Sequence, residues 1–162
     1  MTAARALPAL VILLLAGCDG QREGTLPVVQ IVGADLRYVE AASGPSLDVW
    51  PETREVDRVP AEPCDDPRAD CLPGEAVNRV LPEQTRLVAD RAVRVGGVSV
   101  PAGEDLLAAM DDLARARLAV YPFAVAALPV DALAFGEGPT RLVASWETSD
   151  GLAFSSTVTV RR

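Results

Sequence analysis

The chain has 162 residues, with 15 basic and 23 acidic side chains and a formal charge of −8, and it contains neither histidine nor lysine. These absences exclude a Ser-His-Asp or Cys-His catalytic group, a His-Glu-x-x-His zinc site, a Walker lysine and a Schiff-base lysine within the chain. The acidic balance argues against nucleic acid as a partner and against electrostatic binding to anionic lipid.

The N-terminus has the pattern of a signal peptide. Residues 1–6 carry one charge, Arg5, and residues 7–16 form an apolar run that ends in small residues. This order of a charged, an apolar and a small-residue region is typical of secretory leaders. The apolar run is half the length of about 20 residues that a helix needs to cross a bilayer, so a permanent transmembrane span is not expected.

Residues 15–18 read Leu-Ala-Gly-Cys, and this motif resembles the lipobox of bacterial lipoproteins. The resemblance implies that signal peptidase II removes residues 1–17 and that Cys18 carries lipid, palmitate among its acyl chains. Several long acyl chains would hold the protein at the cell envelope almost permanently. Asp19 resembles a signal for retention at the inner membrane, with the outer membrane as the alternative. An ordinary secretory leader that happens to end before a cysteine is the other interpretation of the motif.

The mature chain is expected to consist of a tether and one domain. Residues 18–26 include two glycines and, up to residue 25, no large apolar side chain, a composition typical of a flexible tether. Residues 27–162 are long enough to form a single domain with its own core. Removal of Arg5 with the leader leaves 14 arginines against 23 acids, a charge of −9.

Cys64 and Cys71 remain as a pair once Cys18 is assigned to the lipid. In an exported protein such a pair predicts a structural disulfide, and a short ring of this kind contributes roughly 2.5 kcal/mol in the chain-entropy model. Redox activity is the alternative, but six residues separate the two cysteines, unlike the Cys-x-x-Cys of thiol oxidoreductases.

The first part of the mature chain predicts three strands, at residues 28–32, 35–40 and 46–50, from their β-branched content and polar-apolar alternation. Residues 51–82 then contain six prolines and an excess of acids, which predicts a long loop with a strand or turn near residues 77–81. Loops of this length in a compact domain are usually functional or disordered.

The acidic loop is also the best candidate for a calcium site. Its acids are Asp65, Asp66, Asp70 and Glu75. Their spacing lacks the alternate acids and the central glycine of an EF-hand, and a solvated acidic loop is the simpler interpretation. No metal or other cofactor is therefore expected.

The middle of the chain predicts short strands at residues 86–89, 92–95 and 98–100 and an ambiguous element at 103–118. Acids open this element, arginines close it, and Asp111 and Arg115 are four residues apart, as in a helix. A period of two fits its second half equally well, which predicts two strands instead. Farther on, Tyr121, Pro122 and Phe123 are expected to pack in the core, with an exposed aromatic patch as the alternative.

The C-terminal segment predicts a β-hairpin closed by a three-residue loop, Ser149 to Gly151, with Gly151 in the left-handed conformation. The loop sets Thr148 opposite Leu152 and Trp146 opposite Phe154. This register places the large apolar pairs on one face. A two-residue loop would shift the register by one residue and bring Trp146 opposite Ser155.

Residues 105–160 resemble the second half of bacterial cadherin-like immunoglobulin-like repeats. The matching positions are Asp111, Asp112, the alternation at residues 118–120, Gly138, Leu142, Ala144, Gly151 and the Val-Thr-Val of residues 158–160. Ala114, Arg115, Trp146 and Thr148 depart from the pattern. The resemblance implies an all-β, immunoglobulin-like β-sandwich with a long disulfide-clipped loop. The alternative is an α+β domain with one helix at about 103–118.

Together these features predict a non-catalytic, lipid-anchored bacterial envelope lipoprotein that presents an immunoglobulin-like domain to another envelope protein or organises the envelope. The loop at residues 51–82 is its candidate contact surface. A calcium-dependent binding module that uses the same loop is one alternative. An enzyme that works with carboxylates alone is another, because glycosidases need only a pair of acids.

Overall fold

A long antiparallel hairpin forms the base of the fold. The computed structural model describes residues 24–61, 74–111 and 113–161. Strand β1 (Thr25–Ala41) pairs with β2 (Gly44–Pro60) from Thr25 opposite Pro60 to Ala41 opposite Gly44, with irregularities after Val28 and Ile31. Gly44 has a φ of 113°, so the tight turn requires the freedom of glycine.

The hairpin corrects two predictions. The strands expected at residues 28–32 and 35–40 are one continuous strand, and β2 runs on to Pro60 through the first ten residues of the predicted loop. Proline is tolerated there because β7 (Ala126–Pro129) pairs with β2 only from Ser46 to Val49. Beyond Val49, the described residues provide no strand on the outer edge of β2. On an edge strand only the N–H groups that face the neighbouring strand form hydrogen bonds within the sheet. Pro51 and Pro60 therefore do not interrupt the pairing of β2 with β1.

Three sheets make up the described part of the chain. The first has the order β3-β1-β2-β7, with β3 (Glu75–Ala76) parallel to β1. The second, β10-β9-β4, contains β4 (Arg86–Ala89), β9 (Thr140–Glu147) and β10 (Ala153–Val160). The third, β6-β5-β8, contains β5 (Val93–Val95), β6 (Val98–Val100) and β8 (Leu133–Ala134). The structure confirms the predicted all-β sandwich class, whereas the closer relation to immunoglobulin-like domains stays a prediction.

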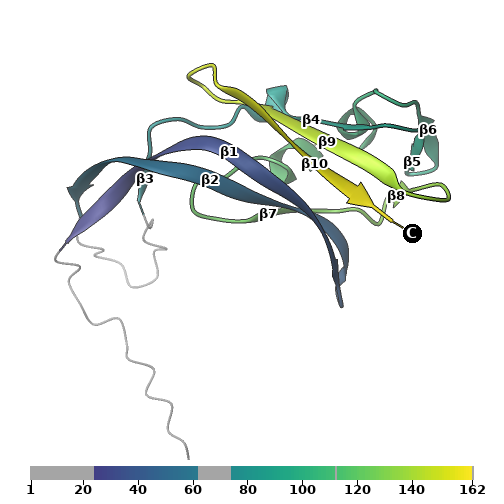
Figure 1. Cartoon of the computed structure of the whole chain (residues 1–162), viewed down its shortest axis with the longest axis horizontal. Helices are drawn as coiled ribbons and strands as arrows, with labels where there is room; N and C mark the ends of the chain where they lie inside the picture. The colour runs from purple at the N-terminus through teal and green to yellow at the C-terminus, as the bar shows by residue number, and fades with distance from the viewer. Residues whose placement is uncertain (1–23, 62–73, 112, 162) are drawn as a thin grey trace, which may run out of the picture.

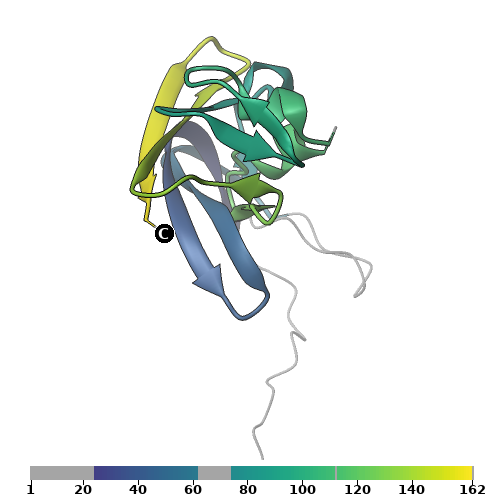
Figure 2. The ribbon, with the colours of Figure 1, turned by 90° about the vertical axis from the view of Figure 1, so that its right-hand side faces the viewer.

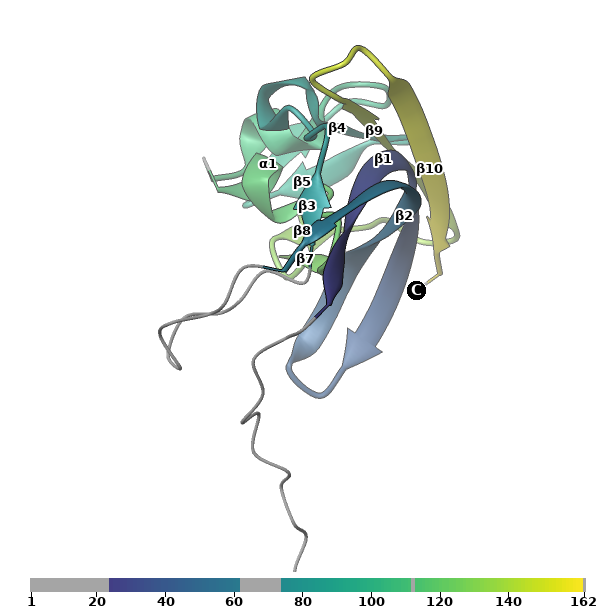
Figure 3. The ribbon, with the colours of Figure 1, turned by 90° about the vertical axis from the view of Figure 1, so that its left-hand side faces the viewer.

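The views show how the sheets lie. β9 and β10 cross the middle of the β1–β2 hairpin, and the start of β1 lies at the opposite end of the long axis from β5 and β6 (Figure 1). The C-terminal hairpin covers one flank of the molecule, and the short helical turns lie on the other (Figures 2 and 3). The buried core contains side chains from the β1–β2 hairpin and from the second and third sheets.

The C-terminal hairpin confirms the predicted register. Thr148 N–H donates to Leu152 C=O at 2.9 Å, and Phe154 lies opposite Trp146. Gly151 has a φ of 79°, as the three-residue loop requires. Trp146 is 2% exposed, its indole donates to the C=O of Leu118 at 2.7 Å, and its ring lies 5.6 Å from that of Phe154. The tryptophan thus anchors the second sheet in the core with its polar atom satisfied.

The described residues between 103 and 118 form neither a continuous helix nor a pair of strands. The structure has a 3-10 turn, η2 (Leu106–Ala109), and a single α-helical turn, α1 (Ala114–Arg117). Leu106, Leu107, Ala114 and Leu118 are buried. The remaining 3-10 turn, η1 (Pro82–Gln84), precedes β4. Both interpretations of this segment are therefore wrong in detail, although the all-β class holds.

Candidate functional site

The sequence-predicted site residues fall mostly outside the described residues. Cys18, the pair Cys64 and Cys71, and the acids Asp65, Asp66 and Asp70 all lie there. Glu75 is described, and it is an exposed residue of β3. Across residues 24–61, 74–111 and 113–161, no group of three or more His, Cys, Asp or Glu side chains is placed to hold a metal. The lipidation, disulfide and calcium predictions stay predictions.

The segment around β3 joins the first sheet to the second. Val77 N–H donates to the C=O of Val29 in β1 at 2.9 Å. Four residues later Leu81 N–H donates to the C=O of Glu147 in β9, also at 2.9 Å. Val80 and Thr148 form an isolated antiparallel bridge between these points. Residues 77–81 therefore form backbone hydrogen bonds first with β1 of the first sheet and then with β9 of the second, and so link the two sheets.

Asn78 lies at the centre of this segment and is 4% exposed. Its Oδ1 accepts the N–H of Ile31 at 2.8 Å, and its Nδ2 donates to the C=O of Ile31 at 3.0 Å. The same Nδ2 also donates to both carboxylate oxygens of Asp150 at 3.2 Å. The buried amide is thus fully engaged in holding β1 and the β9–β10 loop together.

Asp150 accepts hydrogen bonds from several directions. The Thr148 hydroxyl, the Gln30 amide at 3.0 Å and Asn78 all donate to its carboxylate, and they lower its pKa from 3.8 to about 2. Gln30 in turn accepts from Arg54 of β2 at 2.7 Å. Donors to the charged form stabilise that form, which explains the direction of the shift. The carboxylate therefore holds the β9–β10 loop against the β1–β2 hairpin.

A groove of about 630 Å³ opens beside this network. The groove is lined by residues 76–83 and 119–122, together with Ile31 and Ser149. Val77 is 57% exposed and Tyr121 is 46% exposed, with the Tyr121 hydroxyl donating to the C=O of Ala116 at 3.2 Å. The sequence placed Tyr121 in the core, and this is wrong, because tethering of its hydroxyl to α1 holds the ring at the surface.

Phe123, two residues after Tyr121, is half-buried. A Cβ added to Gly74 would lie 2.6 Å from Cζ of Phe123 and 2.5 Å from the C=O of Pro27. The ring is therefore packed beside the first residues of β1, and Gly74 is the residue that permits this approach. Val125, two residues on, is 42% exposed. We call the side chains of Val77, Tyr121, Phe123 and Val125 the apolar rim.

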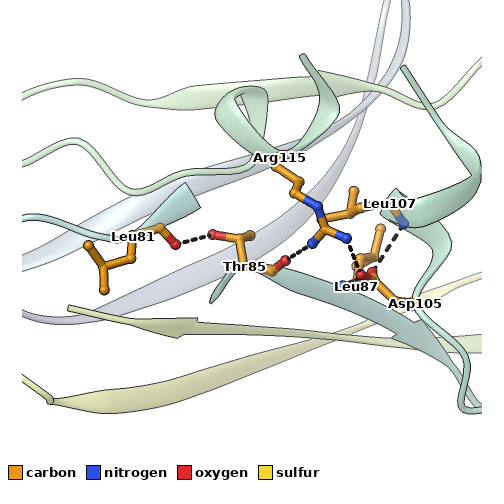
Figure 4. Close-up of polar contacts among 6 residues, drawn as sticks. All are labelled: Leu81, Thr85, Leu87, Asp105, Leu107 and Arg115. Carbon is orange, nitrogen blue, oxygen red and sulfur yellow. Dashed lines mark hydrogen bonds and ion pairs between the residues drawn. The ribbon is translucent and has the colours of Figure 1, made fainter. Parts of the chain in front are cut away.

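A second polar cluster lies at the helical turns (Figure 4). Arg115 of α1 donates to the C=O of Thr85 and, at 2.7 Å, to Asp105 Oδ2. Asp105 Oδ1 accepts the N–H groups of Leu87 and Leu107, both at 3.1 Å, so this carboxylate also caps η2. Every acceptor oxygen of Asp105 has a partner. The cluster therefore clamps η2, α1 and β4 together rather than offering a free reactive group.

The predicted helical pairing of Asp111 with Arg115 is wrong. Asp111 pairs instead with Arg117 at 3.2 Å, and Arg115 turns inward to Asp105. A four-residue helix is too short for the expected stripe of side chains, so the arginine reaches a partner ten residues earlier in the chain. Asp105 was not singled out from the sequence, although an acid directly before an apolar pair is the pattern of a helical cap.

Among the described residues that line the groove, Glu83 is the one carboxylate, whereas glycosidase chemistry needs two acids facing each other. The groove is suited to contact with apolar or amphipathic groups, because Val77 and Tyr121 are exposed on it and Val80, Leu81 and Pro82 line it. Comparison with known protein families, with curated proteins and with solved structures finds no match. In the described part of the chain, no helix is long and apolar enough to cross a membrane.

Proposed function

We propose that the protein is a bacterial envelope lipoprotein, anchored by lipid on Cys18, that displays a non-catalytic β domain for contact with another envelope protein. One observation carries the proposal: the Leu-Ala-Gly-Cys motif of residues 15–18 directly after a short apolar run. The spacing is that of a signal peptide with its cleavage site before the cysteine. Asp19 favours the outer leaflet of the inner membrane, and the outer membrane is the alternative.

The start of the folded domain supports this assignment. β1 begins at Thr25, seven residues after Cys18. Residues 19–24 contain two glycines and no large apolar side chain. Such a segment suits a short tether between a lipid and a folded body. The transition from motif to tether to strand is the order expected for an exported protein held close to a bilayer.

A non-catalytic role is supported by residue types. Histidine and lysine are absent from the whole chain, which removes the commonest general bases and amine nucleophiles. The two polar clusters of the described residues use their carboxylates to hold backbone and side-chain donors. Binding surfaces of β-sandwich domains are usually sheet faces or end loops. The contact with the partner protein is therefore assigned to a surface and not to a catalytic cleft.

Metabolic labelling with an alkyne fatty-acid analogue tests the proposal in the native host. The wild-type protein is expected to incorporate label and to fractionate with membranes. Cys18→Ala is expected to lose the label and to be released, whereas Arg22→Ala, a matched change in the tether, keeps both properties. Label retained by Cys18→Ala would refute the assignment of the anchor.

A further inference from the structure

The apolar rim lies beside the point at which the tether enters the fold. Gly24 C=O accepts the N–H of Ala61 at 2.9 Å, and Thr25 pairs with Pro60, so this end of the hairpin is closed. Phe123 packs against Gly74, which itself abuts Pro27. Val77 is hydrogen-bonded to Val29, five residues into the strand that begins at Thr25. Val77 and Phe123 of the rim therefore lie beside the first residues of β1.

The rim exposes several apolar side chains to solvent. Isolated exposed apolar side chains are ordinary on protein surfaces, but adjacent ones next to a groove indicate a contact surface. Val77, Tyr121 and Val125 are each more than 40% exposed, and the half-buried Phe123 lies between Tyr121 and Val125 in the chain. Arg79 and Glu83, which line the same groove, carry opposite formal charges, so the groove has no excess of either sign. The four side chains of the rim itself are uncharged, with a tyrosine among them.

The length of the tether limits what this surface can reach. Six peptide units connect Cys18 to Gly24, and six residues span at most about 20 Å when fully extended. If Cys18 is held at the lipid headgroups, Gly24 stays within that distance of them, and the rim begins beside the first residues of the strand that follows. Tethering at this range gives the rim a high effective concentration at the surface of the bilayer.

We propose that the apolar rim rests on the headgroup region of the bilayer that holds Cys18. This inference depends on the proposed lipid anchor. Tyrosine is enriched at membrane interfaces because its ring is apolar and its hydroxyl is polar. The acidic domain has no electrostatic attraction to anionic lipid, so the contact forms through apolar burial once the anchor has brought the rim close.

The arrangement also orients the domain. β5 and β6 lie at the far end of the long axis from the start of β1 (Figure 1). Docking of the rim therefore turns this far end away from the lipid and leaves it open to a protein partner. A flexibly tethered domain would instead present every face equally often.

Fluorescence quenching by lipid-attached nitroxides tests the contact. The full-length lipidated protein is reconstituted into phosphatidylethanolamine–phosphatidylglycerol vesicles that contain lipids with a nitroxide near the headgroup. A bimane label is placed at Val77→Cys or, as the matched control, at Val98→Cys in β6, which is also an exposed valine at 64%. Protein without an added cysteine, carried through the same labelling, gives the background.

The expected result is at least twofold stronger quenching at position 77 than at position 98, reduced to the control level by adding Tyr121→Asp. Equal quenching at the two positions would overturn the proposal, whatever else binds the groove. Mass spectrometry of Cys18 in the same samples separates the two claims. If the protein is acylated but the label at position 77 is not quenched, only the proposed docking of the rim is refuted. If the protein is not acylated and does not bind vesicles, the proposed lipid anchor is refuted as well.

Discussion

Asn78 pairs with Ile31 as a neighbouring β-strand would. Its side-chain amide accepts the N–H of Ile31 at 2.8 Å and donates to the C=O of the same residue at 3.0 Å. Ile31 is fully buried, so water cannot replace either bond. A single side chain thus forms hydrogen bonds with both backbone polar groups of Ile31. This residue lies just beyond Val28 and Val29, the two residues of β1 that pair with β3.

Removal of this amide is expected to be costly. Asn78→Ala leaves the N–H and the C=O of Ile31 unpaired in the interior, and the free energy of unfolding should fall by about 2–4 kcal/mol. Urea denaturation followed by circular dichroism measures the change. Gln30→Ala removes hydrogen bonds that are exposed to solvent, and we expect its cost to stay below about 1 kcal/mol. Similar costs for the two variants would show that the Asn78 pairing is not special.

Asp150 predicts a pH dependence of stability. Its pKa in the folded protein is about 2, against 3.8 for an ordinary aspartate, so between these values the unfolded state binds more protons. The contribution of Asp150 is complete above about pH 3.8 and is lost as the pH falls through about 2. Asp150→Asn should flatten the fall in unfolding free energy between pH 4 and 2. An unaltered slope in Asp150→Asn would contradict this assignment.

The pair of Asp105 and Arg115 should behave as one energetic unit. Asp105→Ala removes the cap of η2 and leaves the N–H of Leu87 without its acceptor, which should cost about 2–3 kcal/mol. Arg115→Ala should cost less, about 1–2 kcal/mol, because the backbone bonds to Asp105 remain. In a double-mutant cycle the coupling energy should exceed about 0.5 kcal/mol. Strictly additive effects would mean that the two side chains act independently.

Gly151 is expected to resist substitution. Its φ of 79° lies in the left-handed region, where a Cβ costs about 1–2 kcal/mol. Gly151→Ala should therefore lower the unfolding free energy by about that amount in a chemical denaturation experiment. Gly136→Ala is the matched control, because its φ is not positive and an added Cβ would meet no atom within 4 Å. Equal stability of the two variants would indicate that the β9–β10 loop relaxes freely.

Local patterns predicted the elements that local interactions determine. The β9–β10 register followed from the alternation of apolar residues and from the glycine of the loop, and both are confirmed. The strand at residues 86–89 is also confirmed as β4. In these places neighbouring residues carry enough information, because the loop type and the buried face fix the pairing.

Long-range contacts decided the elements that the sequence misplaced. Pro51 and Pro60 indicated a loop, but the edge position of β2 lets a strand continue through both. Asp105 and Arg115 meet across ten residues, and Asn78 reaches Ile31 across 47. No short-range pattern reports such partners. The groove likewise depends on residues 76–83 meeting residues 119–122, which only the folded chain brings together.

The central claim is the lipid on Cys18, and mass spectrometry of the mature protein purified from its native membrane tests it most directly. The account predicts a polypeptide that begins at Cys18 and carries a diacylglyceryl group on the sulfur, with a mass that drops by the acyl chains after mild alkaline hydrolysis. A mature chain that begins at any other residue, or one that begins at an unmodified Cys18, would contradict it.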